Sequence, residues 1–402
     1  MAAAEERRLV LLLGLATFFE GYGRSLIVIV LPYVQQSFAV SAAALSYILA
    51  VISAGSFGAL LLGMVTDRIG RRRVLLASIL GYAVFGSGTA LAASVAALLV
   101  WQTIARLFQE GALTAAVVIA AEEMPADRRG AAQGVIGTVN SCGAGFAALL
   151  LAVIAYVPGG WRGLAAVSLL PILLLPFLAR QIRESRRWTA AERSQSFAVP
   201  PAYRARLAIA FGLAFLAMSY DVAGFAFTSY VPVTKHGWSP AAVSAMIVVA
   251  GGIGLPGWMV GGELADRLGR RPAAALFLLG LAGAEMLFFL GGEHALWVAF
   301  GLMVFCQAGK MTVLRTWMTE LFPTSVRGTT TAWVTVGGTL GGMVGLAAAG
   351  RIEAALGDIG VALSIVAGAS VVVASLATLL LPETSGLELE MVAPEAVPPG
   401  LS

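Results

Sequence analysis

Eight charged residues lie inside long apolar stretches of the sequence, where a charge is costly. They are four acids and four bases: Glu20, Arg24, Arg106, Glu110, Asp221, Glu285, Lys310 and Arg315. An acid shielded from water can bind and release a proton, because burial favours its neutral form and a nearby cation favours its ionised form. A base in the same setting can hold a carboxylate through charge-assisted hydrogen bonds. The set therefore indicates proton binding and anion binding.

Two pairs of these charges are spaced four residues apart, Glu20 with Arg24 and Arg106 with Glu110. On a helix this spacing places both side chains on one face. Each pair is open to two interpretations, a local neutralisation without further role or part of a proton switch. In the second hypothesis Glu20 is the principal proton carrier and Arg106 is its partner on another helix. Asp221 is the second candidate carrier, and Glu110 completes the predicted proton-coupling set.

Protonation of one acid would turn this neutral set into a net cation, which could hold a substrate carboxylate at Lys310 or Arg106. Arg315 is five residues from Lys310, or about 140° around a helix, so we expect it to snorkel or to pair with Glu320. Glu285 is open to a structural interpretation. The predicted substrate-binding residues, for most of which core packing is the alternative, are Tyr22, Arg24, Asn140, Tyr220, Phe225, Gln307, Lys310 and Trp333.

The elements that position these residues follow from composition. Of the 402 residues 59% are hydrophobic and 12% are charged, whereas soluble domains carry about a quarter charged residues. A bilayer core about 30 Å thick needs ~20 apolar residues per helix. The apolar runs predict an all-α integral membrane protein with twelve spanning helices, near residues 9–31, 41–63, 74–92, 97–120, 131–156, 162–180, 206–233, 240–262, 273–291, 295–318, 329–350 and 357–381.

Most of the 26 Arg and Lys residues fall in loops on one side of these twelve helices. Positive charge in short loops stays in the cytoplasm, so we expect both termini there and a multi-pass protein of the cell (inner or plasma) membrane. The basic residues have this topological explanation, so no nucleic-acid partner is predicted. We expect a monomer in the lipid bilayer that binds a small solute and protons, without cofactor or metal.

The sequence also repeats itself. Residues 63–72, with Gly63, Asp67 and Gly70, recur as residues 262–271, and residues 122–130 recur as residues 320–328. The repeat predicts an N-terminal six-helix bundle at 1–180, a linker at 181–205, a C-terminal six-helix bundle at 206–383 and a tail at 384–402. Six helices per repeat keep both copies in one orientation, and such proteins bind solute between the halves near mid-membrane.

The Gly-x-x-x-Asp-Arg-x-Gly-Arg-Arg pattern of both halves resembles the loop signature of the major facilitator superfamily. Residues 183–188, 320–328 and 382–386 resemble further signatures of its sugar-porter group, shared by organic-ion and aromatic-acid relatives. The resemblance implies a secondary transporter with a cytoplasmic ion-pair gate that opens and closes with alternating access. The gate residues it implies are Asp67, Arg68, Arg71, Arg72, Glu122, Arg129, Glu184, Asp266, Arg267, Arg270, Glu320, Arg327 and Glu383. Topogenic charge is the alternative for these residues.

Other motifs narrow the range of expected substrate classes. Residues 19–23 resemble the Asp-Gly-x-Asp element of aromatic-acid/proton symporters, with Glu20 at the first acidic position and Gly23 at the second. The glutamine-rich seventh-helix motif of sugar porters and the fifth-helix motif of drug/proton antiporters are both absent. The sequence has no ATP-binding loop motif of the Gly-Lys type, which argues against an ATP-driven pump. We therefore expect a transporter and not an enzyme, importing an organic or aromatic acid, favoured over a sugar, with protons. The alternatives are a proton-coupled exporter of drugs or secondary metabolites, and a sensor that does not transport.

Overall fold

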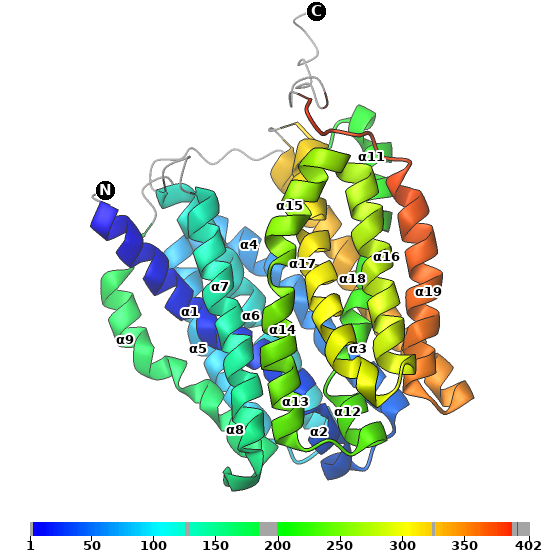
Figure 1. Cartoon of the computed structure of the whole chain (residues 1–402). Coiled ribbons are helices and arrows are strands. Elements are labelled where there is room, and N and C mark those ends of the chain that lie inside the picture. Colours follow the sequence, from blue (N-terminus) through cyan, green and yellow to red (C-terminus); the bar gives the residue numbers. More distant parts are fainter. Residues whose placement is uncertain (1–2, 125–128, 185–198, 324–325, 388–391, 393–402) are drawn as a thin grey trace, which may run out of the picture. The chain divides into compact units, whose positions relative to one another are not determined.

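The computed structural model describes residues 3–124, 129–184, 199–323, 326–387 and 392. These residues form helices and their connections, with no strand among them (Figure 1). The helices are α1 (Ala3–Ile29), α2 (Leu31–Phe38), α3 (Ala42–Ser53), α4 (Gly58–Ile69), α5 (Arg71–Gly88), α6 (Val95–Glu123), α7 (Arg129–Ala152), α8 (Trp161–Ala166), α9 (Pro171–Gln181), α11 (Pro201–Ala226), α12 (Tyr230–His236), α13 (Pro240–Ala245), α14 (Gly251–Gly254), α15 (Gly257–Leu268), α16 (Arg270–Leu290), α17 (Leu296–Glu320), α18 (Arg327–Leu356) and α19 (Ile359–Thr378).

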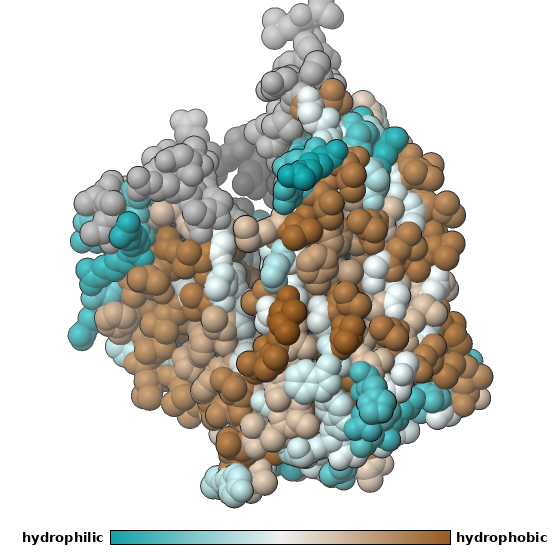
Figure 2. All heavy atoms as spheres, in the orientation of Figure 1, coloured by the Kyte–Doolittle hydropathy of each residue, from teal (hydrophilic) through white to brown (hydrophobic). Residues whose placement is uncertain are grey.

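Twelve helical segments of the described chain are long and apolar enough to cross a membrane, from Glu5–Ile29 at the start to Ile359–Thr378 at the end. Hydrophobic residues cover much of the helix sides in the visible face, and hydrophilic residues gather near helix ends (Figure 2). The predicted fold class, an all-α protein with twelve spanning helices, is therefore confirmed. The observed ends differ from the predicted ones by a few residues.

Three of the twelve segments contain more than one α-helix. The segment Ala42–Gly63 contains a tight turn, Ala54–Phe57, between α3 and α4. In the segment Trp161–Gln181, Pro171 begins α9 and Pro176 lies inside it. Pro256 directly precedes α15 in the segment Pro240–Leu268. Proline has no backbone N–H to donate and so bends or interrupts a helix.

The contacts divide the chain into two compact units. The N-terminal unit consists of Met1–Ser41, Val51–Arg193 and Val233–Val248, and the C-terminal unit of Ala42–Ala50, Ser194–Pro232 and Val249–Ser402. Within the sequence-predicted linker and tail, residues 185–198, 388–391 and 393–402 lie outside the described part of the chain.

Each unit contains a tightly packed helix pair that requires glycine. In the N-terminal unit α1 packs against α7, and a Cβ atom on Gly143 would stand 1.8 Å from the carbonyl oxygen of Phe18. In the C-terminal unit α11 packs against α18, and a Cβ atom on Gly345 would stand 1.7 Å from the carbonyl oxygen of Ser219. Small residues allow such close backbone approach between membrane helices. The close α1–α7 and α11–α18 contacts hold the buried charged residues of α1 and α11 in position.

Candidate functional site

The N-terminal unit contains a fully buried acid on α1. Glu20 is 0% exposed and accepts a hydrogen bond from the Nε atom of Arg24 at 2.8 Å. The amide of Asn140, on α7, also donates to Glu20 and donates to the carbonyl oxygen of Thr17 at 2.9 Å. The pair that the spacing suggested, Glu20 with Arg24, is present in the structure. Asn140 is brought to it by the close α1–α7 contact.

Arg24 also connects α1 to α6. Its Nη2 atom donates to the carboxylate of Glu110 at 2.5 Å, and the hydroxyl of Ser56 donates to the same oxygen at 3.1 Å. Arg24 therefore lies between two acids on different helices. The other pair suggested by spacing, Arg106 with Glu110, does not form among the described residues, since Glu110 binds Arg24 instead.

Arg106 lies one turn before Glu110 on α6 and is half-buried. Its guanidinium group makes no hydrogen bond or ion pair with any described residue. Sequence reasoning made Arg106 the partner of Glu20 from another helix. In the structure Arg24 donates the hydrogen bond to Glu20, from the next turn of the same helix, and the coupling role of Arg106 stays a prediction. Arg106 is left as a cation with unused donors beside the Glu20–Arg24–Glu110 cluster.

The C-terminal unit contains a buried ion pair between α11 and α17. The ammonium group of Lys310 donates to Asp221, and the side-chain amide of Gln307 donates to the other carboxylate oxygen of Asp221 at 2.9 Å. Lys310 is 0% and Asp221 is 2% exposed. Lys310 also lies 5.8 Å from the ring centre of Tyr220, a cation–π arrangement. The predicted anchor Lys310 thus already has a counter-ion.

Glu285, on α16, is the charged residue that sequence reasoning left without a role. It is 1% exposed, and its Oε1 atom has no hydrogen-bond partner in the described structure. Its carboxyl group packs on Gly224, where an added Cβ atom would stand 2.4 Å from Glu285 Cδ. A lone acid in an apolar span was the available signal, but the sequence could not show that a glycine on α11 makes room for it.

Arg315 is exposed on α17. The expected pair between Arg315 and Glu320 is absent from the described contacts, because Glu320 binds Arg270 from α16. The snorkelling alternative for Arg315 stays a prediction.

Two of the predicted lining residues are buried tyrosines with internal partners. The hydroxyl of Tyr22 donates to the carbonyl oxygen of Leu164 at 2.6 Å, and that of Tyr220 donates to the carbonyl oxygen of Leu278 at 3.1 Å. Both side chains are 0% exposed. These contacts favour the core-packing alternative for Tyr22 and Tyr220.

The two other aromatic residues lie in different surroundings. Phe225 is half-buried and contacts Phe300 edge to face, with ring centres 6.4 Å apart. Trp333, on α18, is 51% exposed. Neither contacts the buried charges through a hydrogen bond.

The repeated motif of the N-terminal unit forms a compact polar junction between α4 and α5. Gly70 has a positive φ of 108° at this junction, a conformation that L side chains rarely adopt. The carboxylate of Glu184 accepts a hydrogen bond from the backbone nitrogen of Arg72 at 3.0 Å. Arg71 pairs with Glu122 at 3.0 Å. A carboxylate thus caps the first turn of α5, as expected for an anion at a helix N-terminus.

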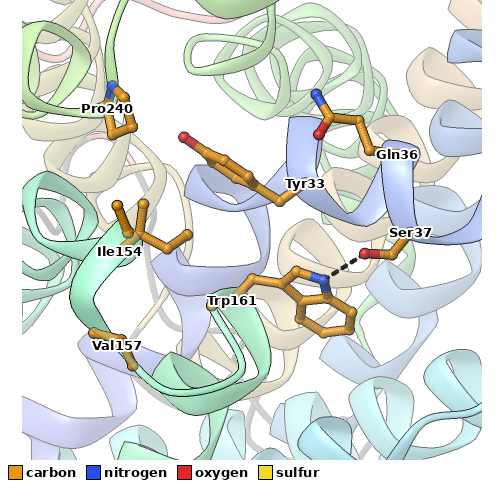
Figure 3. Close-up of a pocket in the computed structure, with 9 residues that line it drawn as sticks. Tyr33, Gln36, Ser37, Ile154, Val157, Trp161 and Pro240 are labelled. Atoms are coloured by element: carbon orange, nitrogen blue, oxygen red, sulfur yellow. Dashed lines mark hydrogen bonds between the residues drawn. The ribbon is translucent and has the colours of Figure 1, made fainter.

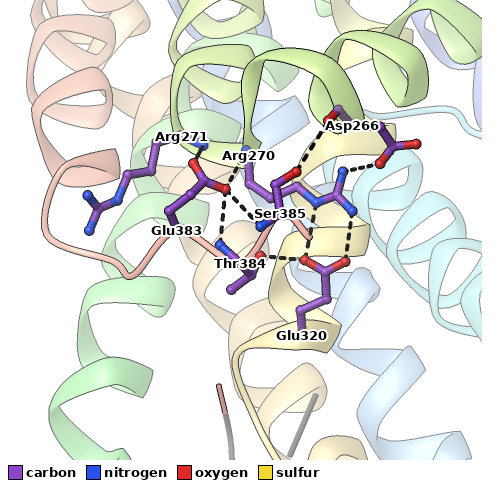
Figure 4. Close-up of polar contacts among 7 residues, drawn as sticks. All are labelled: Asp266, Arg270, Arg271, Glu320, Glu383, Thr384 and Ser385. Atoms are coloured by element: carbon purple, nitrogen blue, oxygen red, sulfur yellow. Dashed lines mark hydrogen bonds and ion pairs between the residues drawn. The ribbon is translucent and has the colours of Figure 1, made fainter. Parts of the chain in front are cut away.

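The C-terminal unit repeats this junction between α15 and α16 (Figure 4). Gly269 has a φ of 100°, and Glu383 accepts hydrogen bonds from the backbone nitrogens of Arg270 at 2.7 Å and Arg271 at 3.0 Å. Arg270 pairs with Glu320 at 3.0 Å. It also pairs with Asp266 at 2.5 Å. The same positions of both sequence repeats therefore make equivalent contacts.

The remaining gate residues make other contacts or cannot be placed. Arg68 is exposed, and Arg267 pairs with Glu263 at 2.5 Å while both stay exposed. The side chains of Asp67, Arg129 and Arg327 lie outside the described part of the structure. The gating role of the whole set stays a prediction.

Opposing effects act on the pKa of Glu383, which lies beyond the end of the last spanning segment. Burial raises its pKa, but the backbone N–H groups of Arg271, Arg270, Ser385 and Thr384 donate to the carboxylate and together hold the pKa below its ordinary value. Hydrogen bonds to the ionised form have this effect. Glu383 is therefore a carboxylate at neutral pH.

A separate hollow of about 370 Å³ lies within the N-terminal unit (Figure 3). The indole nitrogen of Trp161 donates to the hydroxyl of Ser37 at 2.8 Å in its wall. The ring of Tyr33 and the side chain of Pro240 also line it. None of the sequence-predicted site residues is part of this lining.

Comparison with known proteins adds a family and a fold. A family described as Major Facilitator Superfamily matches residues 13–346 and 209–390. A gallate transporter of Pseudomonas putida is 25% identical over 404 residues, covering 87% of this chain and 86% of that protein. A probable 4-methylmuconolactone transporter of Cupriavidus pinatubonensis (strain JMP 134 / LMG 1197) is 28% identical over 302 residues. The match covers 70% of this chain and 67% of that protein.

The fold also resembles solved structures. The crystal structure of a D-xylose-proton symporter superposes with a TM-score of 0.77 at 19% sequence identity. The match covers 94% of this chain and 98% of that one. At this identity the likeness concerns the arrangement of helices alone.

Proposed function

Because the chain belongs to the Major Facilitator Superfamily, we propose that it is a proton-coupled secondary transporter that takes up a small organic acid by alternating access. Family membership makes it a membrane transporter and not an enzyme. The substrate class, the coupling to protons and the direction of transport are the proposed part.

The observation that carries the proposal is the unpaired guanidinium group of Arg106. A half-buried cation without an ion-pair partner among the described residues is costly unless an anion joins it. A carboxylate is the matching anion, because the guanidinium fork can bind both of its oxygens at once. We therefore assign Arg106 as the anchor of the substrate carboxylate, in preference to Lys310, which is bound to Asp221.

The charge of the surrounding cluster explains coupling to a proton. Glu20, Arg24, Glu110 and Arg106 together carry no net charge when all are ionised. A bound carboxylate would leave this buried set with a net negative charge, which a low-dielectric site disfavours. One proton taken up by an acid restores neutrality. Glu20 is the preferred carrier because it is fully enclosed, and its two hydrogen-bond donors, Arg24 and Asn140, can release it by turning away.

The relatives support an organic acid over a sugar. Gallate, the compound in the name of one relative, is an aromatic carboxylate and has the group that Arg106 would bind. The D-xylose-proton symporter supports the fold only. The alternative is export of cationic drugs or secondary metabolites. The buried acids Glu20 and Asp221 could bind such a cation, although Arg106 would repel it.

We further propose the arrangement around this site. The protein would expose the bound acid to each side of the membrane in turn, and the junctions at Arg71–Glu122 and Arg270–Glu320 would form part of a gate on the cytoplasmic side. Both termini would lie in the cytoplasm, and the protein would work as a monomer in the cell membrane.

Uptake into proteoliposomes with an imposed inward proton gradient tests the substrate class. The probes are gallate, D-xylose and tetraphenylphosphonium, each labelled. We expect the gradient to drive accumulation of gallate or another aromatic carboxylate and not of the other two. The Arg106→Gln variant should lose this accumulation, and the matched control Arg351→Gln, at an exposed arginine of α18, should keep it. Accumulation of tetraphenylphosphonium driven by an outward proton gradient, without carboxylate uptake driven by an inward one, would overturn the proposal in favour of the exporter, which exchanges a cation for protons.

A further inference from the structure

The C-terminal unit holds two buried acids and one buried base in a small volume. Asp221 and Glu285 are the acids, and Lys310 is the base. The carboxyl group of Glu285 packs against Gly224, which is three residues after Asp221 on α11. Residues three apart lie on one face of a helix, so both carboxyl groups occupy the same face of α11, one turn apart.

The hydrogen bonds divide unequally between the two acids. Asp221 receives one bond on each oxygen, from Gln307 and from Lys310. The Oε1 atom of Glu285 receives none from the described residues. A buried carboxylate without a partner is far more costly than a buried neutral carboxylic acid. The single positive charge therefore stabilises ionisation of Asp221, and the proton is left for Glu285.

The other groups around Glu285 do not supply a second cation. The charges acting on it are those of Asp221 and Lys310. Tyr220 on α11 and Cys306 on α17 are the remaining titratable groups close to the cluster, and both are neutral in their ordinary forms. Helix α19, which also packs on α16, has no titratable residue. Of the charged residues of α15, Asp266 pairs with Arg270 at the start of α16, and Glu263 pairs with Arg267.

We propose that Glu285 is a proton-binding site of the C-terminal unit, neutral while Lys310 is bound to Asp221 and ionised when Lys310 is released from it. The proton exchange between the two acids is balanced. When Asp221 binds a proton it becomes neutral and no longer requires Lys310 as a counter-ion. Glu285 can then release its proton and ionise beside Lys310. The three groups keep one proton and one cation between two acids throughout. The use of this site in transport rests on the proposed function, whereas its protonation does not.

Infrared spectroscopy of the purified protein in lipid, without substrate, tests the protonation directly. A neutral carboxylic acid in a dry site has a carbonyl stretching band separate from those of carboxylates and amides. We expect the Glu285→Gln variant to lose one such band at pH 7. The control Glu353→Gln, on α18, should leave the spectrum of this region unchanged.

Two further variants keep the test decisive if Glu285→Gln does not fold. Asp221→Asn should also lose the band, because Glu285 then ionises as the partner of Lys310. Lys310→Gln should gain a second band, because neither acid then has a cation. An unchanged band in Glu285→Gln, or no gain in Lys310→Gln, would overturn the proposal. If the infrared band of Glu285 is confirmed but carboxylate uptake does not depend on the proton gradient, the proposed function is refuted and the proton-binding site at Glu285 still stands.

Discussion

The ammonium group of Lys310 donates a hydrogen bond to the carboxylate of Asp221, and the two side chains are 0% and 3% exposed. This contact joins α11 and α17 inside the C-terminal unit. Each ion is tolerated there because the other is present, so removal of one partner leaves a buried charge without compensation.

The first prediction concerns this pair. Lys310→Met alone should lower the free energy of unfolding by about 3–5 kcal/mol, the range for breaking a buried ion pair, less whatever protonation of Asp221 recovers. The double variant Asp221→Asn/Lys310→Met should recover much of the loss, because no lone charge remains. Denaturant unfolding in mixed micelles measures both values. Equal destabilisation by the single and double variants would show that the ion pair does not stabilise the unit.

The second prediction concerns Arg106. Replacement by Gln removes a charge-assisted hydrogen bond worth about 1.5–3 kcal/mol, so affinity for the transported carboxylate should fall roughly 10- to 150-fold. Arg106→Lys should recover part of it, because a lysine keeps the charge and loses the fork. Equilibrium binding of labelled substrate checks both values, with Arg351→Gln as the control. Unchanged affinity in Arg106→Gln would remove this residue from the binding site.

The sequence predicted the elements better than the contacts between them. Apolar runs of known length were enough for the twelve helices, because the bilayer sets both length and composition. The contact between Glu20 and Arg24 followed from spacing on one helix. The contact between Arg24 and Glu110 did not, because it depends on the rotation and depth of α1 relative to α6, which spacing along one helix does not show.

Glu285 also shows that the sequence does not predict contacts between helices. The isolated position of Glu285 in an apolar span was visible in the sequence, but its lack of a partner depends on where Gln307 and Lys310 point. Likewise, the repeat indicated that Arg71 and Arg270 are equivalent. The capping of the two helices by Glu184 and Glu383 came only with the structure, because each cap closes across more than a hundred residues.

The third prediction concerns glycine packing between α1 and α7. Gly143→Ala would place a Cβ atom 1.8 Å from the carbonyl oxygen of Phe18, whereas a Cβ atom on Gly145 would meet nothing within 4 Å. Gly143→Ala should therefore lower the melting temperature and disturb the Asn140–Glu20 contact. Gly145→Ala should have little effect or raise the temperature slightly, because alanine favours helix. Thermal unfolding in one detergent compares the two. Equal melting temperatures would contradict the close approach of these helices.

The fourth prediction concerns the pH dependence due to Glu383. Backbone hydrogen bonds hold its pKa in the folded protein below the ordinary value of 4.5. Its stabilisation is therefore complete above about pH 4.5 and is lost as the pH falls through the lowered pKa. Glu383→Gln should remove this acid-side loss and should cost about 1 kcal/mol at neutral pH, as for other helix caps. Stability curves from pH 3 to 7 test this. A variant with the wild-type curve would exclude Glu383 as the titrating group.

The central claim is that a carboxylate and a proton bind together in the N-terminal unit. Proton uptake on binding measures this directly, in weakly buffered detergent solution with a pH indicator, using the carboxylate identified by the uptake panel. We predict that the wild-type protein takes up about one proton for each carboxylate bound near neutral pH, if each binding event restores the neutrality of the cluster. The control Glu353→Gln should behave as the wild type, and Glu20→Gln should bind the carboxylate with no proton uptake. Carboxylate binding without proton uptake in the wild-type protein would contradict the account.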